Sequence, residues 1–348
     1  MDVPSHLDQH EVAEELPLVT ESARVRSVDA LDDNRASAVL DALREELEPH
    51  DHADWVDECH DDADLDWERL FALVENHEIP DEAVGRFETL KERFERPYPA
   101  LLSIRIEPEE TDIDFTPGQY VTVTFHDTPR PYSVSSSPNE NGLELCIRRV
   151  PEGRLTSDLF QQCEPGDEVS VRGPNGDMVL DEVTRRDVVF LATGTGVAPF
   201  KSMIDYTFEE GRDECNGEKR DVWLFLGSSY RDDAPYYDHW RELADEHENF
   251  HFVPCITREH LLSDWDGESD YVQQTLLKYL DDDVSSADVP ADLERFLDDE
   301  RAEEIDAAID PQNAEVYACG VSAMVQTLTE TVEAIGVDDD DLQAEGFG

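Results

Sequence analysis

Positive charge is scarce in this 348-residue chain. Lys and Arg number 27 against 86 Asp and Glu, which gives a formal net charge of -59 at pH 7, and only four of the basic residues are lysines. DNA and anionic lipid both require a basic face, so neither nucleic acid nor a membrane is expected as a partner. Hydrophobic residues make up 39% of the chain, and carboxylates interrupt nearly every segment, which indicates a folded protein with an acidic surface.

Long apolar runs and metal-type cysteine spacings are also missing. No run has the length of a membrane span, and the first five residues lack the apolar core of a signal peptide; we therefore expect a soluble, cytoplasmic protein. The six cysteines include no C-x-x-C pair, so no metal site is expected. The many carboxylates and few lysines resemble proteins from extreme halophiles, in which molar salt screens the repulsion.

Hydrophobic spacing divides the chain into three parts. Residues 1–95 repeat apolar residues at helical spacing, which predicts an acidic α-helical N-terminal extension. Residues 96–183 carry short β-branched runs between Pro, Gly and Asn, which predict an antiparallel barrel or sandwich. Residues 184–348 alternate continuous apolar strands with helices, which predicts a parallel α/β sheet. Helices are expected over 36–47, 64–74 and 84–94, and strands of the α/β part over 187–192, 222–226, 251–255 and 316–319.

Two segments of the middle part carry groups that suit phosphates and a flat ring. In Arg130-Pro131-Tyr132-Ser133 the arginine can clamp a pyrophosphate, and the tyrosine can stack on a flat ring. Gly153 and Thr156 open the one helix expected in this part, and a helix N-terminus suits a phosphate. Taken singly, the two segments are also compatible with an ordinary barrel strand and a routine helix cap.

A glycine-rich turn follows the first strand of the α/β part. In Thr193-Gly194-Thr195-Gly196 the glycines let the backbone approach a pyrophosphate at a helix N-terminus. No Gly-Lys-Ser/Thr follows, so the turn is not a P-loop.

These motifs, in this order, resemble the ferredoxin–NADP reductase family over about residues 97–348. The strand Cys146-Ile147-Arg148 and the later Cys319-Gly320-x-x-x-Met324 also carry the resemblance. It implies an α+β multidomain protein, with a six-stranded antiparallel β-barrel that binds FAD and then an α/β parallel-sheet NAD(P) domain. NADP(H) is the implied nucleotide and NAD(H) the alternative, because Ser269 stands where plant-type relatives have a lysine.

The resemblance also implies roles for single residues. Ser133, Cys319 and Glu345 would be catalytic by positioning the nicotinamide and polarising flavin N5, and Phe347 would cover the flavin. Thr257 and Arg258 would bind the 2′-phosphate of NADP. The other implied cofactor ligands are Arg130, Pro131, Tyr132, Cys146, Ile147, Arg148, Arg154, Leu155 and Thr156 for FAD, and Thr193, Gly194, Thr195, Gly196, Ser228, Ser229, Tyr271, Gln273, Cys319 and Gly320 for the nucleotide.

The implied activity passes hydride from NADPH or NADH to flavin N5, and then single electrons to a protein acceptor. No ferredoxin-type cysteine segment is present, so the acceptor is expected to be a separate iron–sulfur or other protein, in the first place a ferredoxin. One alternative is the reductase component of an oxygenase or a free-flavin reductase. Another, of a different class, is a non-catalytic flavin-bearing relay or sensor subunit that uses the helical extension for assembly.

Overall fold

The computed structural model divides the chain into two compact units. The large unit contains Met1–Leu31, Leu101–Thr257 and Gly267–Gly348, and the helical unit contains Asp32–Ala100 and Arg258–Asp266. The structure describes residues 9–61, 64–77, 79–110, 112–151, 153–281, 284, 289–291 and 293–347. The first five residues, on which the expectation about a signal peptide rests, lie outside these ranges. No helix within them is long and apolar enough to cross a bilayer.

Six antiparallel strands form the barrel of the large unit. They are β1 (Val19–Ala30), β4 (Leu101–Pro108), β5 (Tyr120–Phe125), β6 (Thr128–Ser133), β7 (Leu143–Arg148) and β8 (Glu168–Asn175). Their order is β6-β5-β8-β1-β4-β7, and a bridge between Val134 and Leu145 joins the two edges. Helix α6 (Arg154–Gln162) follows β7. The six-stranded antiparallel barrel that the resemblance implies is confirmed.

Strand β1 corrects the boundary expected at residue 95, because residues 1–95 are not wholly helical. β1 pairs with both β8 and β4, and Ala23 and Val25 are buried in the barrel. The alternation Ala23-Arg24-Val25-Arg26 has the period of a strand. Its partner β4 lies far along the chain, so the local sequence contains no hairpin pattern that would predict the pairing of β1 with β4. The helical segment is therefore an insertion between the first two strands of the barrel, β1 and β4. A short helix, α1 (Gln9–Glu15), precedes β1.

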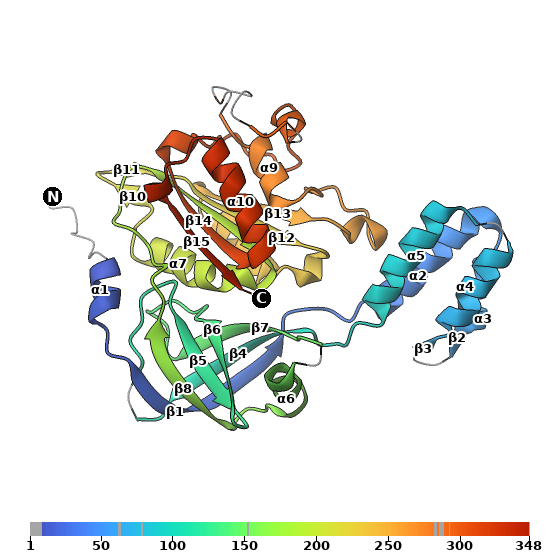
Figure 1. Cartoon of the computed structure of the whole chain (residues 1–348), viewed down its shortest axis with the longest axis horizontal. Helices are drawn as coiled ribbons and strands as arrows, with labels where there is room; N and C mark the ends of the chain where they lie inside the picture. The colour runs from blue at the N-terminus through green and yellow to red at the C-terminus, as the bar shows by residue number, and fades with distance from the viewer. Residues whose placement is uncertain are drawn as a thin grey trace. The chain divides into compact units, whose positions relative to one another are not determined.

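Five parallel strands form the second sheet of the large unit (Figure 1), in the order β13-β12-β9-β14-β15. The parallel α/β domain expected from the sequence is confirmed, with β15 as an additional edge strand. The strands are β9 (Asp187–Thr193), β12 (Val222–Ser228), β13 (Phe250–Ile256), β14 (Ala314–Val321) and β15 (Leu342–Phe347). The connecting helices are α7 (Val197–Glu209), α8 (Tyr237–Glu246), α9 (Val272–Lys278) and α10 (Ser322–Ala334), and β10 (Glu214–Cys215) pairs with β11 (Glu218–Lys219).

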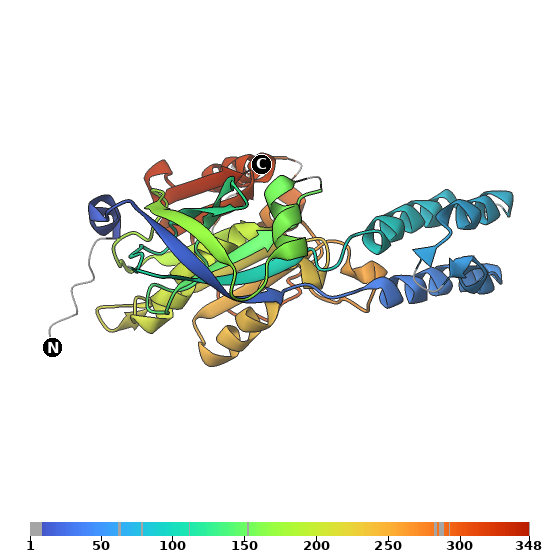
Figure 2. The ribbon, with the colours of Figure 1, turned by 90° about the horizontal axis from the view of Figure 1, so that it is seen from below.

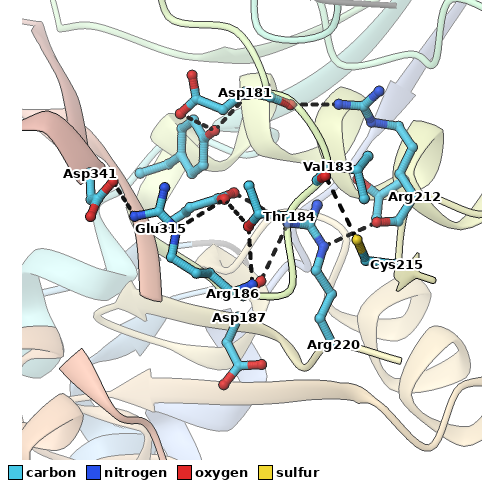
Figure 3. Close-up of polar contacts among 12 residues, drawn as sticks. Asp181, Val183, Thr184, Arg186, Asp187, Arg212, Cys215, Arg220, Glu315 and Asp341 are labelled. Atoms are coloured by element: carbon cyan, nitrogen blue, oxygen red, sulfur yellow. Dashed lines mark hydrogen bonds and ion pairs between the residues drawn. The ribbon is translucent and has the colours of Figure 1, made fainter. Parts of the chain in front are cut away.

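A network of polar side chains fixes the segment that joins the two sheets (Figure 3). The buried Arg212 donates to the carbonyl oxygen of Asp181 at 2.7 Å, and Thr184 donates to Glu315 at 2.6 Å. Arg220 forms a buried ion pair with Glu315 at 3.2 Å. Arg220 precedes β12 and Glu315 begins β14, so the network lies at the amino ends of the parallel strands.

The helical unit contains α2 (Ala36–Leu47), α3 (Asp54–Cys59), α4 (Trp67–Asn76) and α5 (Asp81–Phe94). Helices α2 and α5 lie side by side (Figures 1 and 2) and bury Leu43 and Phe87. Two short strands, β2 (His60–Asp61) and β3 (Asp64–Leu65), separate α3 from α4. Segment 258–266 belongs to this unit because Glu259 pairs with Arg35 at 2.7 Å and Leu261 packs on the helical core.

Candidate functional site

A cavity of about 260 Å³ lies at the carboxyl ends of the five parallel strands. Open parallel sheets bind ligands at this edge, because the loops that leave the strand ends surround a crevice there. The lining residues are Thr193, Gly194 and Thr195 at the end of β9 and beyond it, Gly227, Ser228, Ser229 and Asp233 at the end of β12 and beyond it, Cys255, Thr257, Tyr271 and Val272 at the end of β13 and beyond it, Val321, Met324 and Phe347 near the C-terminus, and Arg148 from the barrel.

The glycine-rich turn at the end of β9 has a backbone that larger residues would disrupt. Gly194 has a φ of +52°, which lies in the left-handed region. A Cβ on Gly196 would lie 2.3 Å from the carbonyl oxygen of Cys319. No side chain caps α7, which starts at Val197. The Val197 N–H already donates to the carbonyl oxygens of Gly194 and Thr195 and Pro199 has no N–H, so Ala198 carries the one remaining N–H of these first three residues.

Two hydroxyl groups of the lining residues have no hydrogen-bond partner among the residues that the structure describes. Thr193 Oγ1 and Ser228 Oγ are both buried, and neither contacts a donor or acceptor within the described ranges. Native structures pair nearly all buried polar atoms, so an unpaired one calls for an explanation. Both residues end strands at the cavity, and the Thr193 oxygen lies against Gly320 of β14.

Three large apolar side chains of the cavity are exposed to solvent. Tyr271 is 57% exposed, Val321 49% and Phe347 41%. Val321 and Phe347 are cross-strand partners on β14 and β15. Flat aromatic faces of this kind can stack on the rings of a nucleotide.

The charge of the cavity comes from one ion pair. Of the described lining residues Arg148 alone is basic, and it comes from barrel strand β7. Its guanidinium lies 3.3 Å from the Asp233 carboxylate and donates to the Asp233 carbonyl oxygen at 3.1 Å. Within the large unit, the barrel thus supplies the cation of a cavity whose other residues come from the α/β domain.

Two arginines of the expected flavin site, Arg130 and Arg154, contact no carboxylate among the described residues, whereas the third, Arg148, pairs with Asp233. Arginines elsewhere, such as Arg44 and Arg69, contact carboxylates. Within the described residues, no carboxylate contacts Arg130 on β6, Arg149 after β7, or Arg154 at the start of α6. Arg130 donates to the adjacent Pro129 carbonyl oxygen at 2.7 Å, and Arg149 lies 5.8 Å from the Phe160 ring. Each of these guanidinium groups is therefore available to an anion.

The other expected flavin ligands lie on the same barrel elements. Tyr132 and Ser133 end β6, and burial raises the pKa of Tyr132 to about 12, so its hydroxyl stays neutral. Helix α6 has no side-chain cap, which leaves its first N–H groups available. The Thr156 hydroxyl already bonds to the backbone of Val150 and Gly153, so this residue offers an anion its backbone N–H.

Cys319 and Glu345 are direct neighbours across β14 and β15. Burial, together with the charge of Glu345, raises the pKa of Cys319 to about 12. Burial also raises the pKa of Glu345, and the nearby Asp177 adds to this effect. The thiol is therefore neutral at physiological pH and is not an activated nucleophile.

The cavity gathers part of the expected site residues. Gly196, Gln273, Cys319, Gly320 and Glu345 belong to the same domain but do not line it. Arg258 belongs to the helical unit, where its guanidinium lies 3.6 Å from Glu92. Gly227, Asp233, Cys255, Val272, Val321 and Met324 line the cavity but are absent from the expected site residues. Met324 belongs to the cysteine–glycine motif and could have been included, whereas Asp233 has no distinguishing local signal among 86 acidic residues.

An arginine-bearing β-barrel and a parallel sheet with a dinucleotide-type cavity, joined in one unit, define a two-domain oxidoreductase fold for a flavin and a nicotinamide nucleotide. Residues 98–180 match the oxidoreductase FAD-binding domain, and residues 190–330 match the oxidoreductase NAD-binding domain. The chain thus carries an FAD-binding and an NAD-binding oxidoreductase domain.

Relatives with curated names support this assignment. Protein RfbI of Salmonella typhimurium is 29% identical over 174 residues, which cover 50% of each chain. The CDP-6-deoxy-L-threo-D-glycero-4-hexulose-3-dehydrase reductase of Yersinia pestis is 30% identical over 227 residues, 65% of this chain and 57% of the relative. The chain therefore spans only about half the length of these relatives. The ferredoxin reductase of carbazole 1,9a-dioxygenase shares the fold, with a TM-score of 0.61 and 18% identity over 96% of this chain and 71% of its own.

Proposed function

We propose that this chain is an FAD-dependent oxidoreductase of the ferredoxin–NAD(P)+ reductase type. It would oxidise NADPH or NADH and deliver single electrons to a separate protein acceptor, for which a ferredoxin is the first candidate. The observation that carries this proposal is the cavity at the strand ends, which the Gly194 turn of the NAD-binding domain lines together with Arg148 of the FAD-binding domain. When bound, FAD supplies the chemistry by accepting a hydride at N5 and releasing electrons one at a time.

The barrel residues have the properties needed to hold FAD. Arg130 and Arg154 lack carboxylate partners among the described residues, and the uncapped start of α6 adds backbone donors. These groups would bind the pyrophosphate. Tyr132 would lie against the flavin ring, with the Ser133 hydroxyl near N5.

The α/β domain would bind the nicotinamide nucleotide. The Gly194–Gly196 turn and the start of α7 would take its pyrophosphate, and Tyr271 would stack on the adenine. Cys319 and Glu345, as direct cross-strand neighbours, would position the nicotinamide, with a neutral thiol that does not repel the hydride donor. Phe347 would cover the flavin and give way to the nicotinamide.

The alternative acceptor is an oxygenase component. It is favoured by the structural likeness to a ferredoxin reductase that serves carbazole 1,9a-dioxygenase. A cytoplasmic location and an origin in an extreme halophile stay predictions of the composition.

The test is purification in molar KCl, followed by assay with NADPH and NADH against ferricyanide. We expect a flavin absorbance band near about 450 nm and rapid oxidation of at least one nucleotide. A yellow protein that oxidises neither nucleotide would favour the relay or sensor subunit. A protein that stays colourless after incubation with FAD would refute flavin binding, and with it the whole proposal.

A further inference from the structure

The loop between β12 and α8, residues 229–236, connects the nucleotide cavity to the barrel. It begins at Ser229, which lines the cavity beside Ser228. Asp233, further along the loop, is buried and holds Arg148 of barrel strand β7. The hydroxyl of Tyr236, the last residue of the loop, lies 3.0 Å from Ser135 Oγ, which follows barrel strand β6. One short loop thus contacts both edge strands of the barrel or their continuations.

Tyr236 has an unusual backbone and a well-packed side chain. Its φ is +61°, a left-handed conformation that is rare for a bulky residue and persists only where the surroundings enforce it. Its ring packs on the cluster formed by Leu101, Cys146 and Ala198, the first two of which belong to the barrel. The Lys201 ammonium of α7 lies 5.2 Å from the ring centroid. The nucleotide domain therefore anchors this side chain in the barrel.

A second attachment of the barrel lies at the opposite end of the parallel sheet. There the covalent linker is fixed by Arg212, Thr184 and Glu315 at the amino ends of the strands (Figure 3). The β12–α8 loop leaves the carboxyl end of β12, on the side of the cavity. Loosening the loop would let the barrel shift at the cavity end while the linker still holds the other end.

We propose that the β12–α8 loop is a clasp that sets the position of the flavin domain against the nucleotide cavity, and that Tyr236 is its positioning residue. The proposal rests on the proposed function, because the distance it controls is the one across which hydride passes from the nicotinamide to FAD. Tyr236 itself would touch neither cofactor. Asp233 would add a direct link, because the arginine that it holds also lines the cavity.

The test removes single oxygen atoms. Tyr236→Phe and Ser135→Ala each abolish the hydroxyl contact and keep the packed ring, so both variants should fold. The matched control is Tyr237→Phe, whose hydroxyl accepts from Arg241 inside the α/β domain, at 3.2 Å. Hydride transfer is sensitive to small displacements. We therefore expect the limiting rate of flavin reduction in stopped-flow experiments to fall about fivefold or more in Tyr236→Phe, with the nucleotide Kd within about twofold of wild type.

Two further measurements separate positioning from mere stability. The double variant of Tyr236 and Ser135 should be no slower than Tyr236→Phe alone, because Ser135→Ala removes one contact of the hydroxyl that Tyr236→Phe removes altogether. Hydrogen exchange of the β7 amides should be faster in Tyr236→Phe than in Tyr237→Phe, with unchanged absorbance of bound FAD. Unchanged rates and unchanged exchange would overturn the clasp, as would an equal loss in Tyr237→Phe. A wild-type protein that oxidises no nucleotide would refute the proposed function instead, while the exchange measurement would still decide whether the clasp exists.

Discussion

Replacing Gly196 by alanine is the sharpest test of the glycine-rich turn. The added Cβ would lie 2.3 Å from the Cys319 carbonyl oxygen, 2.6 Å from its carbonyl carbon and 2.8 Å from Gly320 Cα. All three neighbours are backbone atoms, so no side chain can move aside. Ordinary van der Waals contacts between heavy atoms begin at about 3.5 Å, so the glycine-rich turn and β14 would have to separate by roughly 1 Å.

Such a separation should affect nucleotide binding more than stability. Overpacking of this kind typically costs about 1–3 kcal/mol, which corresponds to a fall in Tm of several degrees. A displacement of about 1 Å can reduce a positioned reaction about a hundredfold, so we expect kcat/KM for NADPH or NADH to fall by about 30- to 100-fold. The FAD content should stay unchanged, because the expected FAD ligands lie in the barrel.

The matched control is Gly85→Ala in α5, where an added Cβ meets nothing within 4 Å. Alanine there should stabilise the helix by about 0.5–1 kcal/mol and leave the kinetics unchanged. Wild-type kcat/KM in Gly196→Ala would refute the assignment of this turn to the nucleotide. A loss of FAD in the same variant would show that the damage spreads to the barrel, which the geometry does not predict.

Three further predictions concern charge and ionisation. Arg130→Ala should weaken FAD binding about 10- to 100-fold, the effect of losing a charge-assisted contact of roughly 1.5–3 kcal/mol. The control is Arg172→Ala, on β8. Equal FAD retention in both variants would contradict the pyrophosphate role. If Arg258 binds a 2′-phosphate, Arg258→Ala should raise the KM for NADPH about 10- to 100-fold and leave that for NADH unchanged, and equal effects on both would exclude this role. Because its pKa is raised to about 12, the Cys319 thiol should resist iodoacetamide at pH 8, while the partly exposed Cys215 reacts first. The measurement is peptide mass spectrometry, and early alkylation of Cys319 would contradict its burial.

The sequence predicts elements well where the burial pattern is local. β9 and β14 are buried along almost their whole length, so their continuous apolar runs predict two buried parallel strands. The local sequence does not predict β15, because it is an edge strand, is only partly buried, and contains Gln343 and Glu345. Its position depends on pairing with β14, which a local pattern does not encode.

The same distinction applies to the site. Thr193 and Gly194 are found from the sequence because a strand end and a glycine turn are local features. Asp233 and Tyr236 acquire their importance only through contacts with Arg148 and Ser135, far away in the chain. Aspartate and tyrosine can serve many structural purposes, so their residue types alone give no reason to select them.

The topology explains why the family resemblance begins only near residue 97. The chain leaves the barrel after β1 and re-enters it at β4, and at that point the Leu31 N–H donates to the Leu101 carbonyl oxygen at 2.9 Å. Segment 258–266 closes in the same way, since the Ile256 N–H donates to the Glu268 carbonyl oxygen at 2.8 Å. In both cases the chain leaves and re-enters the large unit at residues whose backbones are hydrogen-bonded to each other. The match to the oxidoreductase FAD-binding domain accordingly covers residues 98–180, and β1, which precedes the helical unit in the chain, lies outside it.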